Sequence, residues 1–169
     1  YSRQAGNRAL DRSALREALA AFDQARVALH ELPESLARTE QRIDLCFEQR
    51  SALMPLGELA RVGQVLGEAR ALAEELGEQR GLGRVLGYQA QAQTNLGEHA
   101  RAIEAAERAC AIAEAVGELG LRVVANYNLV LALWWAGNPR RASEPVRAVI
   151  ALLQGMPLGD RFGLAGLPA

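Results

Sequence analysis

The tripeptide Leu56-Gly57-Glu58 recurs along the chain as Leu96-Gly97-Glu98 and, in looser form, as Ala136-Gly137-Asn138. The glycines of the three copies are evenly spaced (97 − 57 = 40 and 137 − 97 = 40). A fixed period of this size is typical of stacked repeats, in which each unit buries its apolar face against its neighbours. The spacing therefore predicts an extended array with one long concave surface, which favours a binding scaffold.

A helix with the same apolar pattern follows each of these turns. An apolar residue is followed by a second one four positions on and by a third one three positions further, and this spacing lies on one helical face. The rows are Val62, Leu66, Ala69; Ala102, Ala106, Ala109; Ala142, Val146, Val149; and, after Ser13 in an earlier copy, Ala18, Phe22, Ala25. Seven positions before each turn lies a small residue, Gly6, Ala90 or Val130, except that Arg50 takes this place in the second copy.

These signals predict eight helices, near residues 1 to 11, 14 to 31, 36 to 55, 58 to 75, 79 to 95, 98 to 115, 119 to 135 and 139 to 153. Gly77 and Gly117 suit the left-handed conformation that closes a helix. Pro145 conflicts with the last helix because proline lacks an amide donor and crowds the preceding turn. Either that helix kinks at Pro145 or it begins near Ser143.

Paired helices with this pattern resemble tetratricopeptide repeats, here with helices longer than in the usual unit of ~34 residues. The predicted fold class is all-α, a right-handed α-solenoid of about four such hairpins with a period of ~40 residues. We expect a helical repeat domain over residues 1–154 and a Gly- and Pro-rich tail, or linker to a following repeat, over 155–169. The repeats are expected near residues 1–33, 36–76, 79–116 and 119–154.

Four strings carry a closer resemblance: YSRQAGNRALDRS from Tyr1, ALMPLGE from Ala52, LRVVANYNL from Leu121 and RFGLAGLPA from Arg161. They are similar to the repeat region that follows the ATPase module in large bacterial adenylate or guanylate cyclase-like signalling proteins. This resemblance implies an internal fragment of a longer regulatory protein, in which catalysis belongs to other regions and the repeats receive a signal or a partner. The missing initiator Met also leads us to expect a piece of a longer chain.

The composition restricts the possible partners and chemistry. The 19 basic residues are all Arg, against 20 Asp and Glu, for a formal net charge of −1. We therefore expect neither nucleic acid nor a membrane as partner, and the absence of Lys excludes a Schiff-base lysine and a phosphate-loop lysine. No apolar run approaches the ~20 residues that span a bilayer, and no leader opens the chain. We expect a cytoplasmic protein, and the all-Arg, Ala-rich composition suggests a GC-rich bacterial genome.

We find no catalytic, metal or cofactor motif and predict a non-enzymatic fragment. Gly81, Gly83 and Gly87 resemble a dinucleotide fingerprint, but the spacing is too long and no strand precedes them, so they are interpreted as a helix-start loop with a helix-packing glycine. His30 and His99 lie outside any metal-ligand spacing and are interpreted as polar positions near helix ends. Cys46 and Cys110 are interpreted as small buried residues with free thiols.

The first helix of each repeat should present the partner-binding side chains on the concave face. They form a mixed aromatic and polar set, of the kind in which binding energy concentrates. The candidates are Arg3, Asn7, Phe47, Ser51, Arg84, Tyr88, Gln91, Tyr127, Leu131 and Trp134, with Met54 and Thr94 beside them. The alternative is that Phe47, Tyr127 and Trp134 pack between repeats.

In a relative of this family, basic and amide side chains of the concave face hold a peptide's terminal carboxylate. Arg3, Asn7 and Arg84 match parts of that clamp. Glu48 and Tyr88 stand where an amide and a second basic group are wanted, which argues against carboxylate clamping here.

The last predicted helix has no following repeat to cover its apolar residues Val146, Val149, Ile150 and Leu153. Such a stripe would be covered by the tail, through Phe162 and Leu164, or by a second copy of the chain. Self-association is therefore one alternative to partner binding, and sensing of a small effector is another. Trp134 and Trp135 point about 100° apart on a helix, so one is expected inside and the other at a groove or rim.

Overall fold

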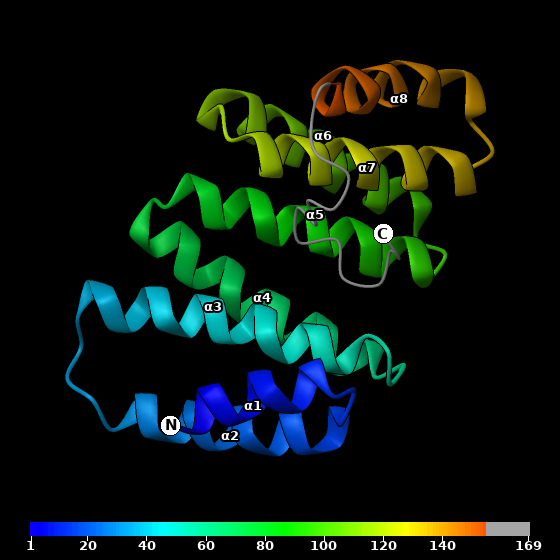
Figure 1. Cartoon of the computed structure of the whole chain (residues 1–169). Coiled ribbons are helices and arrows are strands. Elements are labelled where there is room, and N and C mark those ends of the chain that lie inside the picture. Colours follow the sequence, from blue (N-terminus) through cyan, green and yellow to red (C-terminus); the bar gives the residue numbers. More distant parts are fainter. Residues whose placement is uncertain (155–169) are drawn as a thin grey trace. The chain divides into compact units, whose positions relative to one another are not determined.

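The computed structural model describes residues 1–154, and these form two compact units, residues 1–78 and residues from 79 onward. The first unit contains α1 (Ser2–Asp11), α2 (Leu15–His30), α3 (Leu36–Leu53) and α4 (Leu59–Leu76). The second contains α5 (Gln79–Asn95), α6 (His99–Val116), α7 (Leu119–Trp135) and α8 (Pro139–Leu153). Each unit is a row of helices joined by short turns (Figure 1).

Over the described range these bounds confirm the eight predicted helices to within about two residues, inside the usual uncertainty of such boundaries. The predicted tail, with Phe162 and Leu164, lies outside the described residues.

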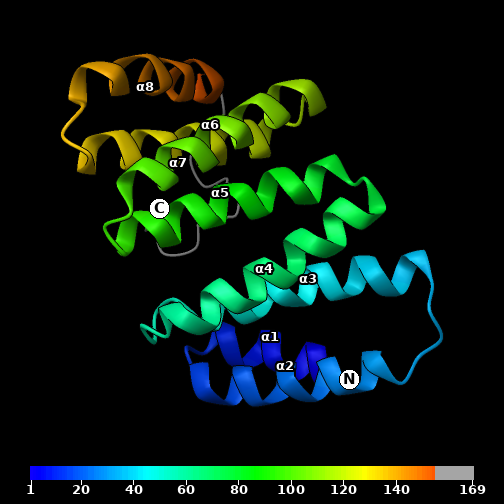
Figure 2. The same ribbon diagram turned by 180° about the vertical axis from the view of Figure 1, so that it is seen from behind.

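Within each unit, every helix packs on its predecessor, and the first and third helices also contact each other. In the first unit α1 packs on α2 and α3, α2 on α3, and α3 on α4; in the second, α5 packs on α6 and α7, α6 on α7, and α7 on α8. The view from behind shows the same succession of helices in each unit (Figure 2). None of the described helices is both long enough and apolar enough to cross a membrane.

Each helix hairpin closes on a residue with left-handed backbone. Gly57, Gly97 and Gly137 have φ of 71°, 77° and 73°, and Ser13 adopts φ of 58° at the corresponding place in the first hairpin. The amide of the next residue donates to a carbonyl five positions back, as Glu58 N to Leu53 O at 3.2 Å and Ala14 N to Ala9 O at 2.8 Å. This bond pattern satisfies carbonyls that the helix end leaves without a partner, and it needs a residue that tolerates positive φ. The predicted turns at Gly77 and Gly117 are also left-handed.

The apolar rows of the sequence form the core. Each residue of the rows that begin at Ala18, Val62 and Ala102 is at most 6% exposed. In the second unit, one core cluster joins α5, α6 and α7 through Leu86, Ala109, Ala113, Leu121 and Ala125. The small residues of α6 therefore allow its neighbours to approach closely, as the repeat pattern predicts.

Gly6 shows why the first helix of a hairpin needs a small residue seven positions before the turn. A Cβ on Gly6 would lie 2.3 Å from Cε1 of Phe22, whose ring is fully buried. In the third repeat the equivalent residues, Ala90 and Ala106, are both small and lie in one cluster. The large ring of Phe22 is thus accommodated by removing the side chain opposite it. Arg50 breaks this rule and is nevertheless buried.

Helix α8 begins at Pro139 and continues through Pro145, so the alternative start near Ser143 is wrong. Pro145 lies inside α8, and the helix continues on both sides of it. The apolar face of α8 is incompletely covered: Val146, Ile150 and Leu153 are 37%, 55% and 38% exposed.

Two glycine substitutions in the first unit should have opposite effects. Gly57→Ala should lower the free energy of unfolding by about 1–2 kcal/mol, because alanine must then adopt the left-handed backbone conformation of Gly57, which is strained for an L-residue. Gly63→Ala in α4 should raise the free energy of unfolding by about 0.5–1 kcal/mol, because alanine favours the helix. Nothing lies within 4 Å of an added Cβ at either position, so the two changes in unfolding free energy contain no contribution from new side-chain contacts. Urea unfolding of both variants checks this, and equal effects would contradict the role of the turn.

Gly6→Ala should destabilise the first unit by about 1–3 kcal/mol through overpacking against Phe22. Combining it with Phe22→Leu should cost less than the sum of the single variants, because the smaller side chain makes room for the methyl group. The measurement is a double-mutant cycle by urea unfolding. Strict additivity would show that the two positions do not press on one another.

Candidate functional site

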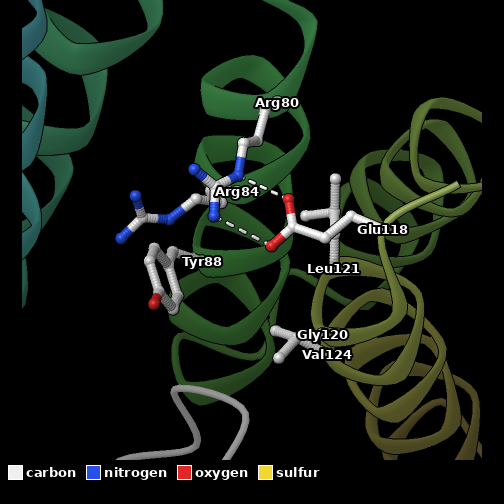
Figure 3. A pocket seen from close by; sticks show the side chains of 7 residues that line it. All are labelled: Arg80, Arg84, Tyr88, Glu118, Gly120, Leu121 and Val124. Carbon is white, nitrogen blue, oxygen red and sulfur yellow. Dashed lines mark hydrogen bonds and ion pairs between the residues drawn. The ribbon is translucent and has the colours of Figure 1, made fainter. Parts of the chain in front are cut away.

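The second unit holds a cavity of about 290 Å³ between α5 and the start of α7, shown in Figure 3. Arg80, Arg84 and Tyr88 lie at successive turns of α5 and form one wall. Glu118, Gly120, Leu121 and Val124 line it from the α7 side. The cavity therefore combines two guanidinium groups, one carboxylate and one phenol with an aliphatic surface.

The glycines of α5 explain how the two helices come close enough to share this cavity. A Cβ on Gly83 would lie 3.0 Å from side-chain atoms of Ile112 and Leu121, and one on Gly87 would lie 3.4 Å from Nδ2 of Asn128. These two glycines therefore face the neighbouring helices, so helix packing holds for two glycines and not one. The expected helix-start loop is wrong, because Gly81, Gly83 and Gly87 all lie inside α5. The positions beside them, Arg84 and Tyr88, carry the long side chains to the cavity.

An ion pair joins the two walls. The Arg80 guanidinium donates from Nε and Nη2 to both carboxylate oxygens of Glu118, the second bond at 2.9 Å (Figure 3). The hydrogen bond from Arg80 lowers the pKa of Glu118; burial opposes this shift, and the charges of Arg80 and Arg84 add to it. Because both side chains are more than a third exposed, the pair orders the cavity mouth more than it stabilises the fold.

The described lining contains no serine, cysteine or histidine that could serve as a nucleophile or an imidazole base. Across residues 1–154, His, Cys, Asp and Glu nowhere gather in groups of three that could hold a metal ion. The arrangement is suited to recognition, since guanidinium groups bind carboxylates side-on and the aliphatic wall accepts an apolar side chain.

Of the predicted binding residues, Arg84 and Tyr88 line the cavity, and Tyr127 is not among its described lining residues. Gln91, Tyr127 and Leu131 are half-buried elsewhere on α5 and α7. Arg80, Glu118, Leu121 and Val124 were not among the predicted site residues. Arg80 could have been found one turn before Arg84, whereas Glu118 is brought to Arg80 only by the packing of two helices.

The expectation that one of Trp134 and Trp135 is inside is wrong. Both lie at the end of α7, and they are 63% and 65% exposed. Trp134 stands one period after Thr94, which is buried. Helix α5, which contains Thr94, packs on the following helices α6 and α7, whereas among the described residues α7 is followed by α8 alone. The buried environment of Thr94 therefore has no counterpart around Trp134.

In the first unit, the predicted residues Arg3 and Asn7 contact acidic residues of α3. Arg3 Nε donates to both carboxylate oxygens of Glu48 at 2.9 Å, its Nη2 to Asp44 at 3.3 Å, and Asn7 Nδ2 to Glu48 at 3.2 Å. Burial disfavours the charged form of Arg3, but the bonds to Glu48 and Asp44 outweigh it and raise its pKa. The carboxylate of Glu48 therefore accepts hydrogen bonds from Arg3 and Asn7, the two residues that would otherwise hold a partner's carboxylate.

The other two candidates of the first unit, Phe47 and Ser51, are engaged within that unit. Phe47 is 4% exposed, which agrees with the alternative that it packs in the interior. Ser51 Oγ donates to the backbone carbonyl of Phe47 at 3.0 Å and is half-buried.

A second cavity, of about 380 Å³, lies in the first unit. It is lined by Arg26, Val27, His30, Glu31, Arg42 and Glu68. Glu68 accepts from Arg26 at 3.2 Å and from Arg42 at 2.8 Å, so the acidic and basic groups of this lining largely balance.

Both cysteines are free thiols, as predicted. Cys46 is buried and Cys110 is half-buried. Burial raises the pKa of both thiols to about 12, with smaller contributions from nearby carboxylates, so neither forms a thiolate readily near neutral pH.

No family model matches the chain, and no curated protein matches it. Among solved structures, a Rap protein complexed with competence and sporulation factor has a TM-score of 0.77 and 14% sequence identity to the chain. The chain has the all-α, tetratricopeptide-like helical repeat fold. The match covers 90% of this chain but 42% of the Rap protein, so the chain spans less than half of that neighbour's length. At this identity the similarity concerns the fold, and the predicted fold class is confirmed.

The pKa of Glu118 should lie below its ordinary value of 4.5 and should rise towards it in Arg80→Gln, because that variant removes the hydrogen bonds that favour the carboxylate. The stabilising effect of the lowered pKa is present above 4.5 and is lost as the pH falls through the folded-state value. Carboxyl-carbon NMR titration of both proteins measures this. An unchanged pKa in Arg80→Gln would show that the ion pair does not form in solution.

Proposed function

We propose that the chain is a non-catalytic, partner-binding repeat module, and that the cavity between α5 and α7 is its main binding site. The observation that carries this proposal is the cavity itself, where recognition groups meet an aliphatic wall without a described nucleophile or metal cluster. Arg and Tyr are enriched where binding energy concentrates. Gln91, Tyr127, Leu131 and Trp134 would extend the contact surface along α5 and α7. Arg3, Asn7, Phe47 and Ser51 belong to the first unit and are not assigned to this site.

Two further points support a regulatory role. The structural neighbour of the same fold is a Rap protein in complex with competence and sporulation factor, which supports recognition of another molecule here. The four sequence strings that resemble cyclase-like proteins support a place inside a longer cytoplasmic bacterial signalling protein.

The binding proposal predicts which variants lose a partner. Peptides selected from a displayed random library against the 169-residue chain should bind Tyr88→Ala at least tenfold more weakly, while helicity and melting change little. The matched control is Arg101→Ala, since Arg101 is an exposed residue of α6 that pairs with Glu98, the N-cap residue of that helix. Fluorescence anisotropy with the labelled peptides measures both affinities. Equal affinity for Tyr88→Ala and the original chain, or no selected peptide, would contradict the site.

Self-association is the second candidate, favoured by the incompletely covered α8 face, on which Val146, Ile150 and Leu153 are exposed and Val149 is half-buried. The equivalent residues one period earlier, such as Ala106 and Ala113, are fully buried, whereas Val146 and Leu153 are exposed. A second copy would remove this apolar surface from water.

This candidate predicts a concentration-dependent dimer at tens of micromolar that Ile150→Glu abolishes, because a charge cannot enter an apolar interface without a partner. Sedimentation equilibrium measures the association, with Ala151→Glu as control at an exposed neighbouring position of the same helix. A monomer throughout this range would reject self-association.

A further inference from the structure

The cavity of the first unit is lined by charges of both signs and by one aliphatic side chain. Its lining comes from the end of α2, from α3 and from α4, and consists of Arg26, Val27, His30, Glu31, Arg42 and Glu68. The formal charges of the two arginines and the two glutamates cancel. With a volume of about 380 Å³, the cavity is at the small end of the range that is typical of small-molecule sites.

Two guanidinium groups are held around one carboxylate in this cavity. One oxygen of Glu68 accepts from Arg26 Nη1 at 3.2 Å, and the other accepts from Arg42 Nη2 at 2.8 Å. A guanidinium group has five N–H donors, and within residues 1–154 Glu68 is the only hydrogen-bond partner of either arginine side chain. Both arginines therefore keep donors for a second carboxylate, and Glu68 shows that one carboxylate can reach both.

The fold does not require these charges. Helices α6, α7 and α8 repeat the pattern of α2, α3 and α4, because the apolar rows recur after 102 − 18 = 84 and 142 − 62 = 80 residues. The residues equivalent to Arg26 and Glu68 are then Cys110 (110 − 26 = 84) and Ala148 (148 − 68 = 80), which are both half-buried. Cys110 packs against the core cluster of the second unit. The repeat thus accepts small apolar side chains at these positions, so the charged lining in the first unit points to a ligand.

The rest of the lining suits an ammonium group and an aliphatic side chain. Glu31 is exposed at the end of α2, and its carboxylate has no partner in the described part of the chain. The carbonyl end of a helix also favours positive charge, and Arg38 already donates to the carbonyl of His30 there at 3.3 Å. Val27 lies one turn before Glu31 and is 66% exposed, so it offers an aliphatic contact.

We propose that this cavity binds a free α-amino acid with an uncharged aliphatic side chain. The carboxylate of the amino acid bridges Arg26 and Arg42. Its ammonium group pairs with Glu31, and its side chain contacts Val27. A lining without net charge matches a zwitterion, whereas Glu31 and Glu68 disfavour phosphate and other multiply charged anions. The cavity shares no residue with the binding site proposed in the second unit, so this inference goes beyond the proposed function.

The test titrates the 169-residue chain with leucine and follows the arginine Nε–Hε signals by NMR. The signals of Arg26 and Arg42 should shift and should saturate below about 10 mM leucine, as expected for a small ligand with two ionic contacts. Leucinamide lacks the carboxylate and N-acetylleucine lacks the ammonium group. Each should bind about tenfold more weakly than leucine.

Two variants assign the two ionic contacts. Glu31→Gln should weaken leucine binding about tenfold and leave N-acetylleucine binding unchanged, because that ligand has no ammonium group. Arg42→Gln should weaken leucine binding by a similar factor and leave leucinamide binding unchanged. The matched control is Arg122→Gln, since Arg122 is the equivalent of Arg42 in the second unit (122 − 42 = 80) and pairs with Glu114 at 2.9 Å. This control should bind leucine as the original chain does.

Three results would overturn the inference. The first is that leucine causes no saturable shift, and the second is that leucinamide or N-acetylleucine binds as tightly as leucine. The third is that inorganic phosphate binds more tightly than leucine, which would indicate a simple anion site. Because the Glu31 carboxylate has no partner among the described residues, Glu31→Gln should leave the melting temperature unchanged, and it keeps the test decisive even where Arg42→Gln unfolds the first unit.

Discussion

The left-handed residue at the end of each hairpin's first helix is the constraint on which the structure depends. Gly57, Gly97 and Gly137 allow the chain to reverse with an amide-to-carbonyl bond across the helix end, and Ser13 shows that the conformation is adopted even without glycine. With Gly77 and Gly117 included, a left-handed glycine occurs at every twentieth residue from Gly57 onward. Helices of nearly equal length follow, and their apolar rows therefore reach equivalent places in successive repeats.

This constraint explains how much of the fold could be predicted. Positive φ is nearly restricted to glycine, so the turns can be read directly from the sequence, and the helices between them follow. The buried rows were predictable because spacings of four and three define one helical face. Exposure at the end of α7 was not predictable from this periodicity, since it depends on which helices surround that end. The expectation that one of Trp134 and Trp135 is inside failed for this reason.

The candidate site was predicted only in part, for a related reason. Arg84 and Tyr88 share a helical face with spacing that the sequence shows, but Arg80 and Glu118 are 38 residues apart and meet through packing. The same holds for Arg3 and Glu48, which are 45 residues apart. Exposed or half-exposed pairs of this kind contribute little to stability. The two parallel hydrogen bonds of the Arg80–Glu118 pair favour a role in fixing how α5 and α7 align.

The repeat also shows how recognition can vary while the fold is retained. Asp44 and Glu48 of the second repeat stand one period before Arg84 and Tyr88 of the third (84 − 44 = 40 and 88 − 48 = 40). The acidic pair binds Arg3 of its own unit, whereas the basic and aromatic pair lines the cavity of the second unit. None of these positions belongs to the apolar rows that hold the hairpins together. Under the proposed function, specificity would reside in the side chains beside the packing face, and two repeats of similar helix pattern could differ in what they bind.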